Sequence, residues 1–156
     1  MTTLIKNADV RLISAGILVS RATATLPATA AQNIFTISGG RILLVSLVGE
    51  VTTIIQAQST TVKVTSTPTT GSAIDMSSAV GDINALEVGG RISLANPPAA
   101  ATALVKTNAG YTNLSAVFTI VPPGSISYTT GATSTGSLKW DLIYVPLDNG
   151  AQVVAA

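Results

Sequence analysis

Short runs of Val, Ile, Thr and Leu make up most of this chain, and Gly or Pro interrupts them at close intervals. β-Branched residues favour extended backbone, and the Leu-, Glu- and Lys-rich stretches typical of helices are missing. Gly and Pro are the residues that tight turns require. We therefore predict an all-β fold, a β-sandwich or barrel-like domain of about ten short strands. Residues 1–27 are predicted to form an extended N-terminal arm or first strand, and residues 28–156 a single β-rich domain.

The clearest strand pattern lies between residues 33 and 58. Three apolar runs, residues 33–38, 41–48 and 51–58, are separated by Gly39-Gly40 and by Gly49-Glu50. Gly-Gly suits a two-residue hairpin loop, and Gly followed by another residue suits the type II′ turn. If both turns close in this way, the facing pairs are Ile37 with Ile42, Phe35 with Leu44, Val48 with Val51, and Leu44 with Ile55. The alternative is one long bent strand with a β-bulge at Gly49.

This meander is predicted to be apolar on both faces. Alternate residues of a strand share a side, so one face forms a core from Phe35, Ile37, Ile42, Leu44, Val48, Val51 and Ile55. The opposite face mixes polar residues with Ile34, Leu43, Val45, Leu47 and Ile54. The centre of that face is too apolar to lie open to water, so a second sheet or a neighbouring subunit is expected to cover it.

The remaining strands are predicted from similar short runs. They cover residues 62–64, 91–94, 117–121, 126–130, 136–146 and 151–156, with turns at residues 68–71 and 147–150. Residues 75–86 are predicted to hold a short helix.

The strand over residues 136–146 carries the single tryptophan. One face of this strand consists of Leu138, Trp140, Leu142 and Tyr144. The opposite face begins with Lys139 and Asp141 and ends with Ile143 and Val145, so the strand is expected to start at an exposed rim and to run into the interior. Trp140 is interpreted as a core residue, with an interface anchor as the alternative.

Composition excludes most chemistry. The chain has no cysteine and no histidine, so it lacks a thiol nucleophile, a thiolate or imidazole metal ligand and a histidine base. Its net charge of +1 gives no field for gathering nucleic acid. No apolar run approaches the roughly 20 residues that a transmembrane helix needs. We predict a protein that is not an enzyme, with no catalytic, cofactor-binding or metal-binding residues and no nucleic-acid, membrane or small-molecule partner.

The N-terminal residues partly imitate a signal peptide. Lys6 and Arg11 precede an apolar stretch, and Ala22-Thr23-Ala24 has the small residues of a cleavage site. Asp9 and Arg21 do not fit that pattern. An arm or first strand is the preferred interpretation.

Charged side chains are few, and we assign none of them a chemical role. The acidic cluster of the chain consists of Asp75, Asp82, Asn84 and Glu87. Their spacing does not match the calcium-loop pattern, so a solvated loop is the interpretation. Lys139 and Asp141 are predicted to form an exposed ion pair worth under about 1 kcal/mol. Arg11, Arg21 and Arg91 are interpreted as ordinary surface residues.

Two blocks of the sequence resemble a known class of proteins. They are residues 35–56 (FTISGGRILLVSLVGEVTTIIQ) and residues 136–156 (GSLKWDLIYVPLDNGAQVVAA), together about a quarter of the chain. Both resemble small structural proteins of tailed bacteriophages, of the capsid decoration (cement) type. The resemblance implies a β-rich homotrimer on the outer capsid surface of the virion, at three-fold and quasi-three-fold positions, where it would resist internal DNA pressure. Its partners would be other copies of itself and the major capsid protein.

The composition agrees with such a role. Apolar residues make up 47% of the chain and charged residues 10%, against a usual charged share of about 25%. A surface with so little charge is expected to be covered by other protein. An arm ending near Pro27 is expected to pack Ile17 and Val19 on the adjacent subunit. The alternatives are a tail, neck or fibre component of a phage and, less favoured, a secreted glycan-binding β-domain.

Overall fold

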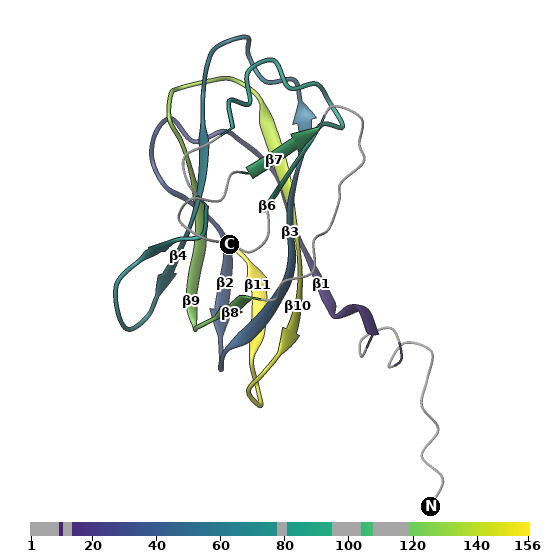
Figure 1. Ribbon diagram of the computed structural model, residues 1–156, viewed down its shortest axis with the longest axis vertical. Coiled ribbons are helices and arrows are strands. Elements are labelled where there is room, and N and C mark those ends of the chain that lie inside the picture. Colours follow the sequence, from purple (N-terminus) through teal and green to yellow (C-terminus); the bar gives the residue numbers. More distant parts are fainter. Residues whose placement is uncertain (1–9, 11–13, 78–80, 95–103, 108–118) are drawn as a thin grey trace, which may run out of the picture.

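The fold is a β-sandwich in which two antiparallel sheets pack face to face (Figure 1). The computed structural model describes residues 10, 14–77, 81–94, 104–107 and 119–156. Both sheets are open, with strands at their edges, so the all-β prediction is confirmed and the barrel-like alternative is not realised.

Sheet A contains six strands. They are β1 (Ile17–Thr25), β10 (Ser137–Pro146), β3 (Ile42–Thr53), β6 (Arg91–Leu94) and β7 (Leu104–Thr107) in spatial order, with β8 (Thr119–Val121) also paired to β3. Sheet B contains five. They are β11 (Gln152–Ala155), β2 (Gln32–Ser38), β9 (Gly124–Thr130), β4 (Val62–Pro68) and β5 (Ile74–Asp75) in spatial order. The strands predicted at residues 62–64, 91–94, 126–130, 136–146 and 151–156 are confirmed. The one predicted at 117–121 is confirmed for β8, and residues 117–118 lie outside the described part.

The predicted hairpin at Gly39-Gly40 is wrong. β2 pairs with β11 and β9 in sheet B, whereas β3 pairs with β10, β6 and β8 in sheet A. Gly39 has a φ of 74°, and an added Cβ would lie 2.0 Å from the carbonyl oxygen of Gly150. Only a glycine allows that approach, so the Gly-Gly pair lets the chain cross from one sheet to the other beside the turn that precedes β11.

The predicted turn at Gly49-Glu50 is also wrong, and the long-strand alternative is right. β3 runs without a break from Ile42 to Thr53. Its register with β10 shifts at two places, between Leu44 and Ser46 and between Val51 and Thr53, so the bulge predicted at Gly49 is wrong. Gly49 instead lies directly opposite Trp140, and an added Cβ would be 3.1 Å from two atoms of the indole ring. The absent side chain makes room for the largest side chain of the core.

The predicted core was nearly correct although the pairing was not. Phe35, Ile37, Ile42, Leu44, Val51 and Ile55 are all buried in one cluster. They meet because β2 and β3 lie in facing sheets, and both direct these residues into the shared interior. Ile34 and Leu47, assigned to the opposite face, are buried too, and Val48 is not. Register shifts in β2 and in β3 change the alternation at these points.

Trp140 is a core residue, as predicted. Leu138, Trp140, Leu142 and Tyr144 are all buried on the inner face of β10. The indole ring also contacts the ring of Tyr128 from sheet B, with centroids 5.2 Å apart at an angle of 51°. This contact joins the two sheets at the centre of the sandwich.

The helix predicted over residues 75–86 is not present in the part of this segment that the structure describes. Ile74–Asp75 forms β5, and Asn84 and Ala85 form a turn. One carboxylate oxygen of Asp82 accepts hydrogen bonds from the backbone N–H groups of Thr60 and Asn84, at 3.0 and 2.9 Å. A side chain that bonds to nearby backbone in this way competes with helix formation.

The N-terminal region enters the fold at β1. Ile17 and Val19 pack against the core of their own chain, so the expected packing of these two residues on an adjacent subunit is wrong. β1 pairs with β10 along its length, from Ile17 opposite Tyr144 to Thr25 opposite Ser137.

Candidate interaction surface

The acidic side chains are scattered over the residues that the structure describes. Those residues contain no group of three or more acidic, histidine or cysteine side chains that could hold a metal ion. The acidic cluster does not assemble, because Asp75 pairs with Lys63 at 3.2 Å while Asp82 caps its own loop. Among the described residues, no helix is both long enough and apolar enough to cross a membrane.

The predicted ion pair between Lys139 and Asp141 does not form. Lys139 lies directly opposite Glu50 on β3 and bonds to it at 3.2 Å, and Glu50 also bonds to Arg91 of β6 at 2.9 Å. Asp141 instead accepts a hydrogen bond from Ser20 of β1. Residues opposite one another on adjacent strands lie closer than residues two apart on one strand. Lys139 and Asp141 therefore bond to residues on adjacent strands and not to each other. Arg91 is part of an ion-pair row rather than a free surface residue.

Arg21 is also not an ordinary surface residue. It lies opposite Trp140 in the β1–β10 pair and is only partly exposed. Its Nε donates a hydrogen bond to the backbone oxygen of Ala156, at 3.0 Å. Arg21 thus connects the edge of sheet A to the strand at the edge of sheet B. Arg11 lies outside the described residues.

Three titratable groups depart from their ordinary pKa, and each has a structural explanation. The hydrogen bond to Asp148 raises the pKa of Arg41. Burial raises the pKa of Tyr128 to about 12. The Arg41 guanidinium donates to both carboxylate oxygens of Asp148, at 2.9 and 2.8 Å, and holds the pKa of that carboxyl well below its usual range. Arg41 and Asp148 tie the Gly39-Gly40 crossing to the turn before β11.

The outer face of sheet A is divided into a charged end and an apolar end. The charged end contains the Lys139–Glu50–Arg91 row. At the other end, side chains from four adjacent strands form what we call the apolar face. Its members are Leu18 of β1, Ile143 and Val145 of β10, Leu43 and Val45 of β3, and Ile120 of β8.

Strand pairing places these six residues side by side. Leu18 lies opposite Ile143, and Leu43 lies between Val145 and Ile120. Leu18 is 61% exposed and Ile120 57% exposed, while the central residues are partly buried by their neighbours. The apolar face therefore crosses the sheet from β1 to β8 without a charged side chain among its members.

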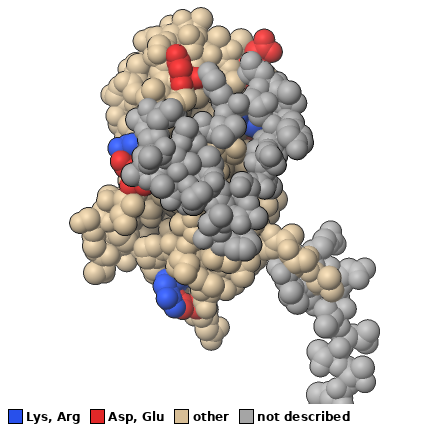
Figure 2. All heavy atoms as spheres, viewed as in Figure 1, with Lys and Arg blue, Asp and Glu red and all other residues tan. Residues whose placement is uncertain are grey.

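The outer face of sheet B is different in kind. Thr36, Ser125 and Thr67 form one row across β2, β9 and β4, and Asn33, Ser127 and Thr65 form another. Val154 of β11, which is 49% exposed, is an apolar exception at the edge. Ser127 is buried, but the other hydroxyl side chains of these rows are at least partly exposed, so this face suits solvent better than the apolar face does. In Figure 2 the charged side chains of the described surface are few, and several lie beside one of opposite charge.

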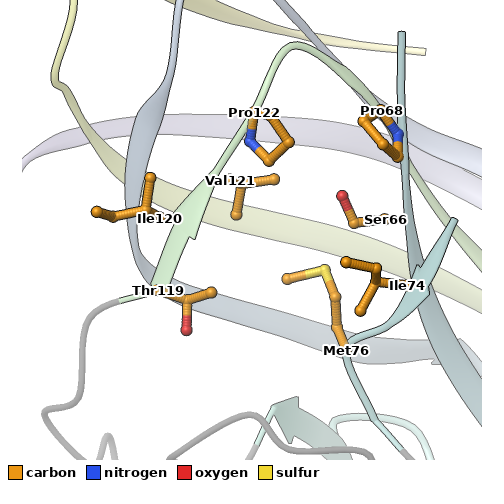
Figure 3. A pocket seen from close by; sticks show the side chains of 8 residues that line it. All are labelled: Ser66, Pro68, Ile74, Met76, Thr119, Ile120, Val121 and Pro122. Carbon is orange, nitrogen blue, oxygen red and sulfur yellow. The ribbon is translucent and has the colours of Figure 1, made fainter. Parts of the chain in front are cut away.

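A pocket lies at the open edge of the sandwich, where β4 and β5 of sheet B approach β8 of sheet A (Figure 3). We call it the edge pocket. It has a volume of about 190 Å³ and is lined by Ser66, Pro68, Ile74, Met76, Thr119, Ile120, Val121 and Pro122. The side chains of Ile74, Met76 and Val121 surround the hollow, and none of the lining residues is charged.

Sequence reasoning found only part of this surface. It placed Leu43 and Val45 on a face too apolar for water, and both residues lie on the apolar face. It assigned Ile143 and Val145 to a strand end that enters the interior, whereas both are partly exposed on the outside of sheet A. Their alternation with Leu142 and Tyr144 was visible in the sequence. Nothing in the sequence pointed to the edge pocket.

Comparison with protein-family models, curated proteins and solved structures found no match to this chain.

Proposed function

We propose that this chain is a non-enzymatic structural protein of a tailed-phage virion, a capsid decoration (cement) protein. In this proposal it forms a homotrimer on the outer capsid surface and docks on the major capsid protein through the apolar face. The two blocks that resemble such proteins, residues 35–56 and 136–156, supply most of β2, β3, β10 and β11. β3 and β10 provide four of the six residues of the apolar face.

The observation that carries the proposal is the contrast between the outer faces of the two sheets. A cement protein acts through buried area, and one face of this molecule has the composition that such burial requires. Burying an exposed aliphatic side chain contributes about 1.5–3 kcal/mol, which the cost of association reduces. The apolar face spans four strands at about 4.8 Å spacing, a width of roughly 15–20 Å that suits a broad shell surface better than a small ligand.

Docking is tested by co-sedimentation with purified capsids that lack the chain, taken from the phage that encodes it. The variants Leu18→Asp and Ile120→Asp place a carboxylate on the apolar face at exposed positions, so folding should be preserved. We expect each to weaken binding at least about tenfold, because burying an unpaired carboxylate costs more than about 1.4 kcal/mol. Val154→Asp is the matched control, since it replaces an exposed apolar strand residue on sheet B.

Three results would contradict this proposal. The first is binding of Leu18→Asp and Ile120→Asp at wild-type affinity. The second is loss of binding by Val154→Asp to the same degree. The third is binding of the wild-type chain to purified tails and not to capsids, which would favour the tail, neck or fibre alternative.

A further inference from the structure

We propose that the edge pocket receives an aliphatic side chain from the N-terminal segment, residues 1–13, of a second copy of this chain. This inference rests on the proposed self-association and not on the proposed location in a virion. It assigns the contact between subunits to the edge pocket, which shares Ile120 with the apolar face, and leaves the other five residues of that face for a different partner.

The chemistry of the pocket selects an aliphatic occupant. Its lining is almost wholly apolar, and the residues that surround it include Pro68, Met76, Val121 and Pro122. Ile74 is 67% exposed at its rim. A cavity of about 150 Å³ with similar walls is large enough for benzene. The edge pocket, at about 190 Å³, therefore has room for one Leu or Ile side chain and no charged group to bind a polar ligand.

The N-terminal segment supplies such side chains. It contains two aliphatic pairs, Leu4-Ile5 and Leu12-Ile13, in a stretch that precedes β1. A segment of 13 residues can extend up to about 40 Å at roughly 3.3 Å per residue. This reach covers the width of a neighbouring subunit's sheet. Four aliphatic side chains in so short a segment favour burial against an apolar surface.

The direction of the chain before β1 favours a second copy over the chain's own pocket. Ser14 and Ala15 lie in a helical turn, in which Ser14 Oγ donates a hydrogen bond to the backbone oxygen of Val10 at 2.8 Å. Gly16 follows with a φ of 83°, and an added Cβ would lie 2.8 Å from the backbone oxygen of Tyr144. This glycine turns the chain away from β10. In Figure 1 the helical turn leads away from the sandwich.

The positions of β1 and of the edge pocket agree with exchange of the N-terminal segment between copies. Ile17, Tyr144, Leu44 and Thr119 form one row across sheet A, so β1 and β8 lie at the same end of the sandwich. They lie on opposite sides of β10 and β3. Ser14 and Ala15, which lead away from the sandwich, therefore lie on the side of sheet A opposite β8. In the proposed ring of identical copies, the β1 side of each copy faces the edge pocket of the next.

The contact can be tested by cross-linking because the chain has no cysteine of its own. Each of Ile5→Cys and Leu12→Cys is combined with Ile74→Cys, and the proteins are oxidised and separated on non-reducing gels. We expect covalent oligomers from at least one of these pairs. The same pairs with Val88→Cys are the control, since Val88 is 64% exposed in the loop beside the opposite end of β3. Disulfides that form only within one chain, or equally with Val88→Cys, would overturn the inference.

A second test measures the oligomeric state by light scattering after size exclusion. We expect Ile74→Asp and deletion of residues 1–13 each to shift the wild-type oligomer to monomer, while Val88→Asp leaves it intact. An unchanged oligomer in both altered proteins would overturn the inference. Capsid co-sedimentation separates the two proposals. An oligomer that needs residues 1–13 and binds no capsid refutes the proposed function alone, and a capsid-binding oligomer that does not need them refutes this inference alone.

Discussion

Substituting Gly49 by Ala should destabilise the protein as long as Trp140 is present. The added Cβ would lie 3.1–3.2 Å from three atoms of the indole ring, closer than the 3.4–4 Å of ordinary contact. Trp140 is fully buried and packs on Tyr128, so the ring has no room to move aside. Overfilling a packed core costs about 1–3 kcal/mol, and replacing Gly by Ala returns about 0.4–1 kcal/mol through the unfolded state. We expect a net loss of about 1–2 kcal/mol.

The effect of Gly49→Ala on stability should change sign when Trp140 is replaced. In a Trp140→Leu background the indole ring is gone, and only the favourable effect on the unfolded chain remains. Gly49→Ala should then stabilise the protein by about 0.4–1 kcal/mol. The coupling between the two sites is therefore about 1.5–3 kcal/mol, within the range of residues in direct contact.

The four proteins of this cycle are compared by urea unfolding. Far-UV circular dichroism is the appropriate signal, because Trp140 is the single tryptophan and its fluorescence is lost in half of the cycle. An equal effect of Gly49→Ala in both backgrounds would show that the ring does not lie over residue 49. A stabilising effect in the presence of Trp140 would refute the packing argument outright.

Three further predictions concern the core, the sheet crossing and the charged row. Tyr128 has a pKa of about 12 in the folded protein and about 10 in the unfolded chain, so the unfolded state releases its proton first. The free energy of unfolding should therefore fall by about 2–3 kcal/mol between pH 10 and pH 12, and Tyr128→Phe should remove that part of the fall. Gly39→Ala should lower the Tm by roughly 5 °C or more in calorimetry, because the new Cβ meets the backbone of Gly150 and the φ is left-handed. Glu50→Gln should cost less than about 1 kcal/mol in low-salt urea unfolding, and the difference should disappear near 1 M salt, since the partners Lys139 and Arg91 are partly exposed.

The candidate surface was only partly predictable, and the reason is how it is assembled. Leu43 and Val45 come from a single run, and their place on a second apolar face could be inferred from that run alone. Leu18 and Ile120 are about a hundred residues apart in the sequence, and they share a face only because β10 and β3 lie between β1 and β8. No local pattern carries that information. The edge pocket depends in the same way on strands from both sheets.

The sequence by itself determined the all-β fold and most of the buried residues, because alternation of apolar side chains is a property of each strand alone. Trp140 and its neighbours on β10 are the clearest example. Tertiary structure decided which strands pair and which face each bulged strand presents. Gly39-Gly40 is compatible with a hairpin and with a crossing between sheets, and only the packing of β2 against β11 and β9 selects the crossing. Gly49 is compatible with a turn, but in the structure it lies within the long strand β3, where its missing side chain leaves room for the indole ring opposite it.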